Sequence, residues 1–301
     1  MASPSSGRLW AVVLVDDGLP YSAEGEPPVP FSDDLAQRSA LDCTLRRTQL
    51  AVPAQSTVVI GAARDQPRLS RETATFPGNV LIQPSDRGSA ARLLWPVYWI
   101  HRFDPDAVVV AIPAGRQMRE DMVFMDHLVR VVGRVANDPR WIVIVGARPV
   151  DPGSDHAWII RAECLHDDVE RVWRVRDLPE GALSPGFHGN GLWNTRVVVG
   201  QARTFIEAAK TCLPRLHAAF ADAAQHAGTW REPAAFEEAY GRIAACDFFP
   251  ALRDASFPRI AASCLPPIHW NDPLPSRQAR PQRDVRAAID LTATGSVQRV
   301  A

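Results

Sequence analysis

A chain of 301 residues can bury a large core, and its 33 basic and 34 acidic residues nearly balance, which argues against nucleic acid or an anionic membrane as the main partner. No apolar run approaches the roughly 20 residues needed to span a bilayer, and no signal-like segment opens the chain, so we expect a soluble protein. Five scattered cysteines without a CxxC pair favour a cytoplasmic location, and the eight histidines lack the HxxxH spacing of a zinc site.

The first half of the chain alternates short apolar runs with helical patterns. This alternation predicts an α/β domain with a mostly parallel sheet, whose ligands lie beyond the carboxyl ends of the strands. The loops after Val15, Ile82 and Ile112 are therefore candidate sites. The expected strands are Leu9–Val15, Thr57–Gly61, Val80–Ile82, Ala107–Ile112 and Trp141–Val145, and the expected helices are Leu35–Leu50, Ser89–Phe103 and Arg119–Asn137.

Helical spacing within Arg119–Asn137 predicts which of its side chains pack on the sheet. The expected set is Met122, Met125, Leu128, Val129 and Val132.

The pattern changes after residue 150. Three expected strands without long helices between them indicate an antiparallel addition to the sheet, and three helices follow, two of them with proline suited to the first turn. The strands are Ala157–Arg161, Val169–Val175 and Thr195–Val199, and the helices are Ala202–Cys212, Pro214–Gln225 and Pro233–Ala245. From about Ser276 the chain is polar and weakly periodic, so we expect residues 276–301 to form a mobile tail.

Six stretches carry a resemblance, in chain order and at compatible spacing. They are Trp10–Leu14 (WAVVL), Pro28–Phe31 with Ser39–Arg47 (SALDCTLRR), Leu81–Ala91 (LIQPSDRGSAA), Asp104–Ala114 (DPDAVVVAIPA), Leu192–Thr195 (LWNT) and Trp270–Asp272 (WND). Together they resemble the first strand, the PKQF loop and its helix, the EPxxRNTAP loop, the strand ending in Pro-Ala-Asp, the WNSG segment and the late Trp-x-Asp of mannose-1-phosphate guanylyltransferases, members of the nucleotidyltransferase superfamily.

The resemblance implies a Rossmann-like, GT-A-like sheet flanked by helices. It implies one domain over residues 1–275, with a nucleotide half at about 8–150 and a sugar-phosphate half at about 151–275. It also implies Mg²⁺ as the cofactor of an active enzyme. The implied contacts are Gln83, Pro84, Arg87 and Ser89 for the nucleotide, Arg176, Asn194 and Arg196 for the sugar phosphate, and Asp272 for the metal.

Several charged groups of the family's motifs are replaced. Asp16 and Asp17 follow the first strand where the family has a glycine-rich phosphate loop, Val29 stands for the PKQF lysine, and Gly115 stands for the strand-end aspartate. A single lysine, Lys210, lies far along the chain from these motifs. Arg176 falls near the family's second lysine, but a guanidinium does not reproduce an ammonium's geometry.

Structural roles remain open for the same residues. Asp16 and Asp17 fit an ordinary acidic turn, Asp272 fits a capping carboxylate, and the Gln83–Ser89 loop fits a helix start with Ser89 near its N-cap. Gln83, which replaces a glutamate, could still contact a base, and Arg196, which replaces the WNSG glycine, should enter the sugar-phosphate pocket.

Three hypotheses follow from these substitutions. The first is a degenerate nucleotidyltransferase, or pseudoenzyme, that binds a nucleotide, a sugar nucleotide or a protein partner such as an active relative. The second is an active enzyme in which Arg87, Arg176 and Arg196 supply positive charge and Asp272, with Asp16 or Asp17, holds the metal. The third is a structural subunit, in a homo-oligomer or other assembly, without a small-molecule ligand.

Overall fold

The computed structural model describes residues 9–15, 38–115, 117–118, 120–149, 157–167, 170–180, 189–268 and 270–271. The acidic pair Asp16–Asp17, Val29, Asp272 and the expected tail 276–301 lie outside these residues, and so do the expectations that rest on them.

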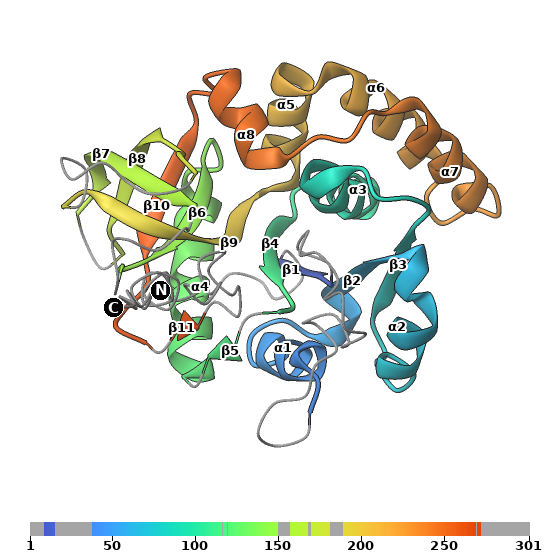
Figure 1. The fold of residues 1–301 in the computed structure, drawn as a ribbon, viewed down its shortest axis with the longest axis horizontal. Helices are drawn as coiled ribbons and strands as arrows, with labels where there is room; N and C mark the ends of the chain where they lie inside the picture. The colour runs from blue at the N-terminus through green and yellow to red at the C-terminus, as the bar shows by residue number, and fades with distance from the viewer. Residues whose placement is uncertain are drawn as a thin grey trace, which may run out of the picture.

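A nine-stranded sheet runs through both halves of the chain, in the order β3-β2-β1-β4-β9-β6-β10-β8-β7 (Figure 1). The strands are β1 (Leu9–Leu14), β2 (Thr57–Ala62), β3 (Asn79–Gln83), β4 (Val108–Pro113), β6 (Ile142–Ala147), β7 (Trp158–His166), β8 (Val172–Asp177), β9 (Gly191–Gln201) and β10 (Ile260–Cys264). The first four strands are mutually parallel, and β1 pairs with both β2 and β4. This confirms the predicted sheet, in which the strands at Leu9, Val80 and Ala107 belong together.

Helices cover both faces of the sheet (Figure 1). On one face lie α3 (Gly88–Phe103), α5 (Ala202–Cys212), α6 (Pro214–Ala223), α7 (Glu232–Arg242) and α8 (Phe248–Asp254); on the other lie α1 (Ala40–Thr48), α2 (Gln66–Glu72) and α4 (Asp121–Asn137). Alternate residues of each strand enter opposite cores, because side chains along a strand point to opposite faces. Val12 packs under the first group of helices, for example, and Val13 under α1 and α2.

The second half of the sheet is mixed and closes on itself. Strand β9 runs antiparallel between β4 and β6, and β8 runs antiparallel to both β10 and β7. Residues Trp158–Ile160 of β7 also pair with β9, so β9, β6, β10, β8 and β7 form a ring of paired strands. The predicted antiparallel addition is thus present, and the ring sets β9 at the junction of the two halves.

A two-residue antiparallel ladder joins two segments that are far apart in sequence. Strand β5 (Gln117–Met118), just after β4, pairs antiparallel with β11 (Trp270–Asn271). The chain therefore brings the segment after Pro113-Ala114-Gly115 beside Trp270 and Asn271.

Some predicted details were wrong. Met122 and Val129 are 59% and 38% exposed rather than packed on the sheet, and α4 instead buries Phe124, Val131 and Val135 with Met125, Leu128 and Val132. Helix α1 begins at Ala40, not in the region of Leu35, because Ser39 caps it by accepting a hydrogen bond from the amide of Asp42 at 3.1 Å. The sequence analysis did not predict α2, α8 or β10.

Truncation of a core leucine tests the packing of α3 on the sheet. Leu94 is 0% exposed, and Leu94→Ala should lower the free energy of unfolding by about 2–5 kcal/mol, because it removes buried methyl groups and leaves a cavity. Leu50, which is 51% exposed, serves as control: Leu50→Ala should change stability by less than about 0.5 kcal/mol. Urea unfolding measures both, and equal costs would contradict this packing.

Candidate functional site

A pocket of about 630 Å³ opens where the two halves of the chain meet. Leu14 ends β1 and Pro113 ends β4, so the pocket lies beyond the carboxyl ends of parallel strands, where such sheets bind ligands. The start of α3, strand β9 and the start of α8 complete its walls. Its polar and charged lining residues are Asp86, Ser89, Arg92, Glu180, Asn194, Arg196 and Asp247, and its aromatic ones are Trp158, Phe248 and Phe249.

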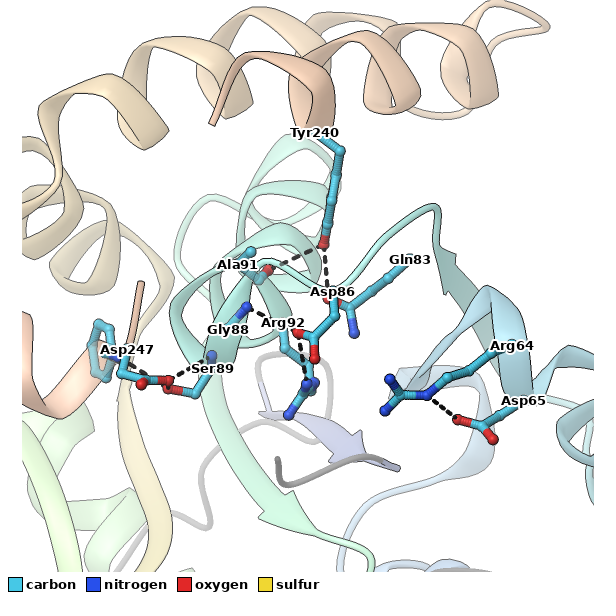
Figure 2. Close-up of polar contacts among 11 residues, drawn as sticks. Arg64, Asp65, Gln83, Asp86, Gly88, Ser89, Ala91, Arg92, Tyr240 and Asp247 are labelled. Carbon is cyan, nitrogen blue, oxygen red and sulfur yellow. Dashed lines mark hydrogen bonds and ion pairs between the residues drawn. The ribbon is translucent and has the colours of Figure 1, made fainter. Parts of the chain in front are cut away.

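The starts of α3 and α8 cap each other (Figure 2). The Asp247 carboxylate accepts hydrogen bonds from the Ser89 amide at 3.0 Å and from the Ser89 hydroxyl at 2.7 Å. In return the Ser89 hydroxyl oxygen accepts from the Phe248 amide at 3.1 Å. Each residue therefore satisfies an amide at the start of the other residue's helix, which otherwise lacks an intrahelical partner.

Backbone hydrogen bonds reinforce this crossed capping. The Cys246 amide donates to the Arg87 carbonyl at 3.0 Å, and the Cys246 carbonyl accepts from the Ala90 amide at 3.1 Å. Gly88 between them has φ of +80°, and a Cβ there would lie 2.3 Å from the Cys246 carbonyl oxygen. Glycine is required at this position by both its conformation and the close approach of Cys246.

Gln83 lies beneath the α3 loop rather than on the pocket wall. Its side chain is 0% exposed, and its Oε1 accepts a hydrogen bond from the Tyr240 hydroxyl at 3.1 Å (Figure 2). Burial raises the pKa of Tyr240, so the phenol stays protonated and remains a donor. The Gln83 amide nitrogen has no hydrogen-bond partner among the described residues. Contact of Gln83 with a base stays a prediction, and it requires access to a buried amide.

Two further residues of that loop, Pro84 and Arg87, are not part of the pocket lining. Pro84 is exposed, and Arg87 Nε donates to the Tyr240 carbonyl at 3.1 Å. Arg87 thus fastens the loop to α7. Of the four residues expected to contact a nucleotide, Ser89 alone is part of the pocket lining.

A bulge in β9 carries Arg196 into the pocket. Val145 pairs with Val197 but Gly146 pairs with Asn194, so Thr195 and Arg196 are extra residues on β9. Arg196 has φ of +63°, a left-handed conformation that favours glycine. This is the position that the resemblance assigns to the glycine of the WNSG segment, and here an arginine has a conformation that favours glycine.

Side chains within the bulge hold this conformation. Asn194 Oδ1 accepts from the Arg196 amide at 2.8 Å, and the Thr195 hydroxyl donates to the Val145 carbonyl at 2.6 Å. Asn194 and Thr195 are both buried. The structure therefore brings two of the three predicted sugar-phosphate residues, Asn194 and Arg196, to the same pocket as Ser89.

The pocket contains paired charges of both signs. Arg92 is 2% exposed and its Nη2 lies 3.3 Å from Asp86 Oδ1. Burial by itself raises the pKa of Asp247, but hydrogen bonds from Ser89 and the charges of Arg196 and Arg92 outweigh it, and the net pKa lies below its ordinary value. Asp247 is therefore negative at neutral pH and faces two arginines.

Arg176 is not part of this pocket's lining. Arg176 is exposed on β8, although Leu178 and Glu180, just after it, do line the pocket. Asp272 lies outside the described residues, but the pairing of β11 with β5 places its neighbour Asn271 beside the segment that follows Gly115.

The described residues supply no carboxylate at the strand-end position that the resemblance assigns to a magnesium ligand. Mg²⁺ is usually held by one or two carboxylates together with substrate phosphates. Gly115 offers no side-chain oxygen where the strand ends, and no group of three or more His, Cys, Asp or Glu side chains suited to a metal occurs among the described residues. We derive no chemical step through a metal.

Sequence reasoning missed Arg92 and Asp247. Arg92 lies inside an apolar helix pattern, where a buried cation is unexpected. Asp247 precedes Phe248-Phe249-Pro250, and an aspartate before an apolar run with an early proline is typical of a helix start. That signal could have predicted α8 and its N-cap.

Substitution of Arg196 tests the left-handed backbone. Arg196→Gly should be more stable than Arg196→Ala by about 1 kcal/mol, because only glycine adopts this φ without steric cost. Arg161 on β7 is the control, and there the glycine variant should be less stable than the alanine variant by about 0.5–1 kcal/mol. Chemical unfolding of the four variants measures both differences, and the same sign at both positions would be inconsistent with a left-handed Arg196.

Removal of the Ser89 hydroxyl tests the crossed capping. Ser89→Ala should lower the free energy of unfolding by about 1 kcal/mol, within 0.5–2 kcal/mol, because the Phe248 amide at the start of α8 loses its acceptor and the Asp247 carboxylate loses the hydroxyl donor. The lowered pKa of Asp247 means that its contribution is complete above the ordinary pKa of about 3.9 and is lost as the pH falls through the lower value in the folded state. The cost of Ser89→Ala should therefore shrink below about pH 4. Ser85→Ala, at an exposed serine of the same loop, should show neither effect.

Comparison with known proteins identifies the class of fold. No protein-family model and no curated protein matches the chain. Solved structures do match, and they place the chain among proteins with the fold of sugar-phosphate nucleotidyltransferases.

Three of these structures show the extent of the likeness. Mannose-1-phosphate geranyltransferase from Thermus thermophilus matches with a TM-score of 0.71 and 19% identity over 88% of this chain and 76% of that chain. Mannose-6-phosphate isomerase from Helicobacter pylori matches with a TM-score of 0.67 and 13% identity over 88% of this chain and 100% of that one. A UDP-glucose pyrophosphorylase complexed with UDP-glucose matches with a TM-score of 0.54 and 9% identity over 88% and 93%. At these identities the likeness shows the fold.

Proposed function

We propose that this protein is a degenerate member of the nucleotidyltransferase fold, a pseudoenzyme whose pocket binds a nucleotide or sugar nucleotide with little catalysis. One observation carries the proposal: Arg92 and Arg196 line a pocket of about 630 Å³ at the carboxyl ends of the parallel strands. Arginine forms charge-assisted, often bidentate hydrogen bonds with phosphate, and the aromatic and apolar walls suit a sugar or a base.

The missing groups support the second half of the proposal. Nucleotidyl transfer depends on positioned cations that neutralise the charge developing in the transition state. Gly115 offers no carboxylate at the end of β4, and Lys210 lies on α5, outside the pocket lining. The resemblance to guanylyltransferases suggests a GDP- or GTP-like ligand. The proposed protein partner is a second copy of this chain, in a homo-oligomer, or an active relative. A cytoplasmic location, suggested by five scattered cysteines without a CxxC pair, belongs to the same proposal.

The alternative is an active enzyme in which arginines replace the family's lysines. Arg196 in the pocket is the observation that favours it, since it could supply positive charge to a transferring phosphate. That enzyme would hold its metal with Asp272. The two functions differ in turnover, not in binding.

A ligand screen with a turnover assay tests both functions. In thermal-shift measurements with GTP, GDP, GDP-mannose, UDP-glucose and mannose 1-phosphate, a ligand at one hundred times its dissociation constant should stabilise the protein by about 2.7 kcal/mol. With mannose 1-phosphate, GTP and Mg²⁺ we expect little or no GDP-mannose. Turnover at about 1–1000 per second would instead establish the active enzyme, and no stabilisation by any compound would leave a structural subunit.

Two arginine variants locate the bound phosphate. Arg196→Ala should lower the affinity for the best ligand of the screen by about 10- to 100-fold, because it removes a charge-assisted hydrogen bond worth about 1.5–3 kcal/mol. Arg87→Ala tests the contact that the EPxxRNTAP resemblance implies. A loss of affinity at Arg87 without one at Arg196 would place the phosphate at the α3 loop instead.

A further inference from the structure

The first amides of α3 already have acceptors from the protein itself. The Gly88 amide donates to Asp86 Oδ1 at 2.9 Å, the Ser89 amide to Asp247 Oδ1 at 3.0 Å, and the Ala90 amide to the Cys246 carbonyl at 3.1 Å. The start of a helix attracts anions, because its amides lack intrahelical acceptors and lie at the positive end of the helix dipole. Here two of the three acceptors are carboxylates.

Apart from the helix start, two positively charged arginine side chains line the same pocket. Arg92, almost wholly buried, and Arg196, on the β9 bulge, both line the pocket that Asp247 lines. Both arginines contribute to the lowered pKa of Asp247, so both are close enough to attract its charge. The Asp247 carboxylate therefore occupies surroundings of helix amides and guanidinium groups that suit a phosphate.

We propose that Asp247 is a specificity-determining residue, an internal anion that competes with the phosphate of a ligand for the start of α3 and the pocket arginines. The proposal rests on the proposed function, since it concerns how the same pocket selects its ligand. A phosphate oxygen would take the hydrogen bonds of the Ser89 amide and hydroxyl, and the carboxylate would turn away. Ligands without a phosphate would not compete with Asp247.

In this exchange the Asp247 side chain rotates, and helix α8 stays in place. Phe248 and Leu252 anchor α8 in the core, each 1% exposed, and the Cys246 backbone stays paired with α3. Rotation of one aspartate side chain leaves these contacts intact. The fold can therefore exchange its own carboxylate for a ligand without unfolding a helix.

Asp247→Asn is the informative variant, because the amide oxygen can still accept from Ser89 while the negative charge is removed. Asp254→Asn is its matched control, since it removes the same charge from the exposed end of the same helix. Titration calorimetry would use GDP-mannose and inorganic pyrophosphate as phosphate probes, with guanosine and mannose as uncharged counterparts. Thermal unfolding of each variant without ligand shows that the titrated protein is folded.

We expect Asp247→Asn to bind both phosphate probes about tenfold or more tightly than wild type, because it removes a like charge next to the phosphate. Asp254→Asn should bind as wild type does, and the uncharged probes should not distinguish the proteins. If wild type binds the phosphate probes and Asp247→Asn binds them equally or more weakly, Asp247 does not compete with the phosphate. That result would overturn this inference and leave the proposed function standing. Failure of wild type and both variants to bind either phosphate probe would overturn both proposals.

Discussion

The crossed capping of α3 and α8 is the interaction that holds the candidate site together. Ser89 belongs to the first half of the chain and Asp247 to the second, and their hydrogen bonds close the pocket wall between them. The loop before α3 depends on the same joint, since Arg87 and Gly88 are held against Cys246. Because the capping groups are also pocket groups, the stability of the joint and the chemistry of the pocket are set by the same side chains.

Fold and chemistry depend on different parts of this sequence. The sheet requires apolar residues along its strands, a condition that many sequences satisfy, and the likeness to solved structures persists at 9–19% identity. A reacting site requires particular charged groups at particular positions. In this chain Gly115 follows β4 and Arg196 takes a left-handed conformation on β9, so neither position has the residue that the guanylyltransferase resemblance assigns to it.

The parallel strands of the first half were predictable because they are short, largely apolar runs, as in β2 and β4. The exposure of Met122 and Val129 was not, because several helical stripes fit the apolar residues of α4 and the choice depends on tertiary packing. Motif order named Ser89, Asn194 and Arg196, which line the pocket. Asp247 and Arg92 were missed because neither lies in a matched motif, and Asp247 contacts a residue far away in sequence, Ser89. Bulged pairing and long-range capping have no local signature of sufficient strength.

The ring of β9, β6, β10, β8 and β7 has a consequence for aggregation. Strands paired on both sides present no row of free amides and carbonyls to another chain. Within the described residues, the large sheet therefore ends in an open edge at β3, a strand of five residues in which Asn79 and Val80 reach solvent. Short edge strands resist templated strand addition, so the β3 edge is a poor template for a strand of another chain.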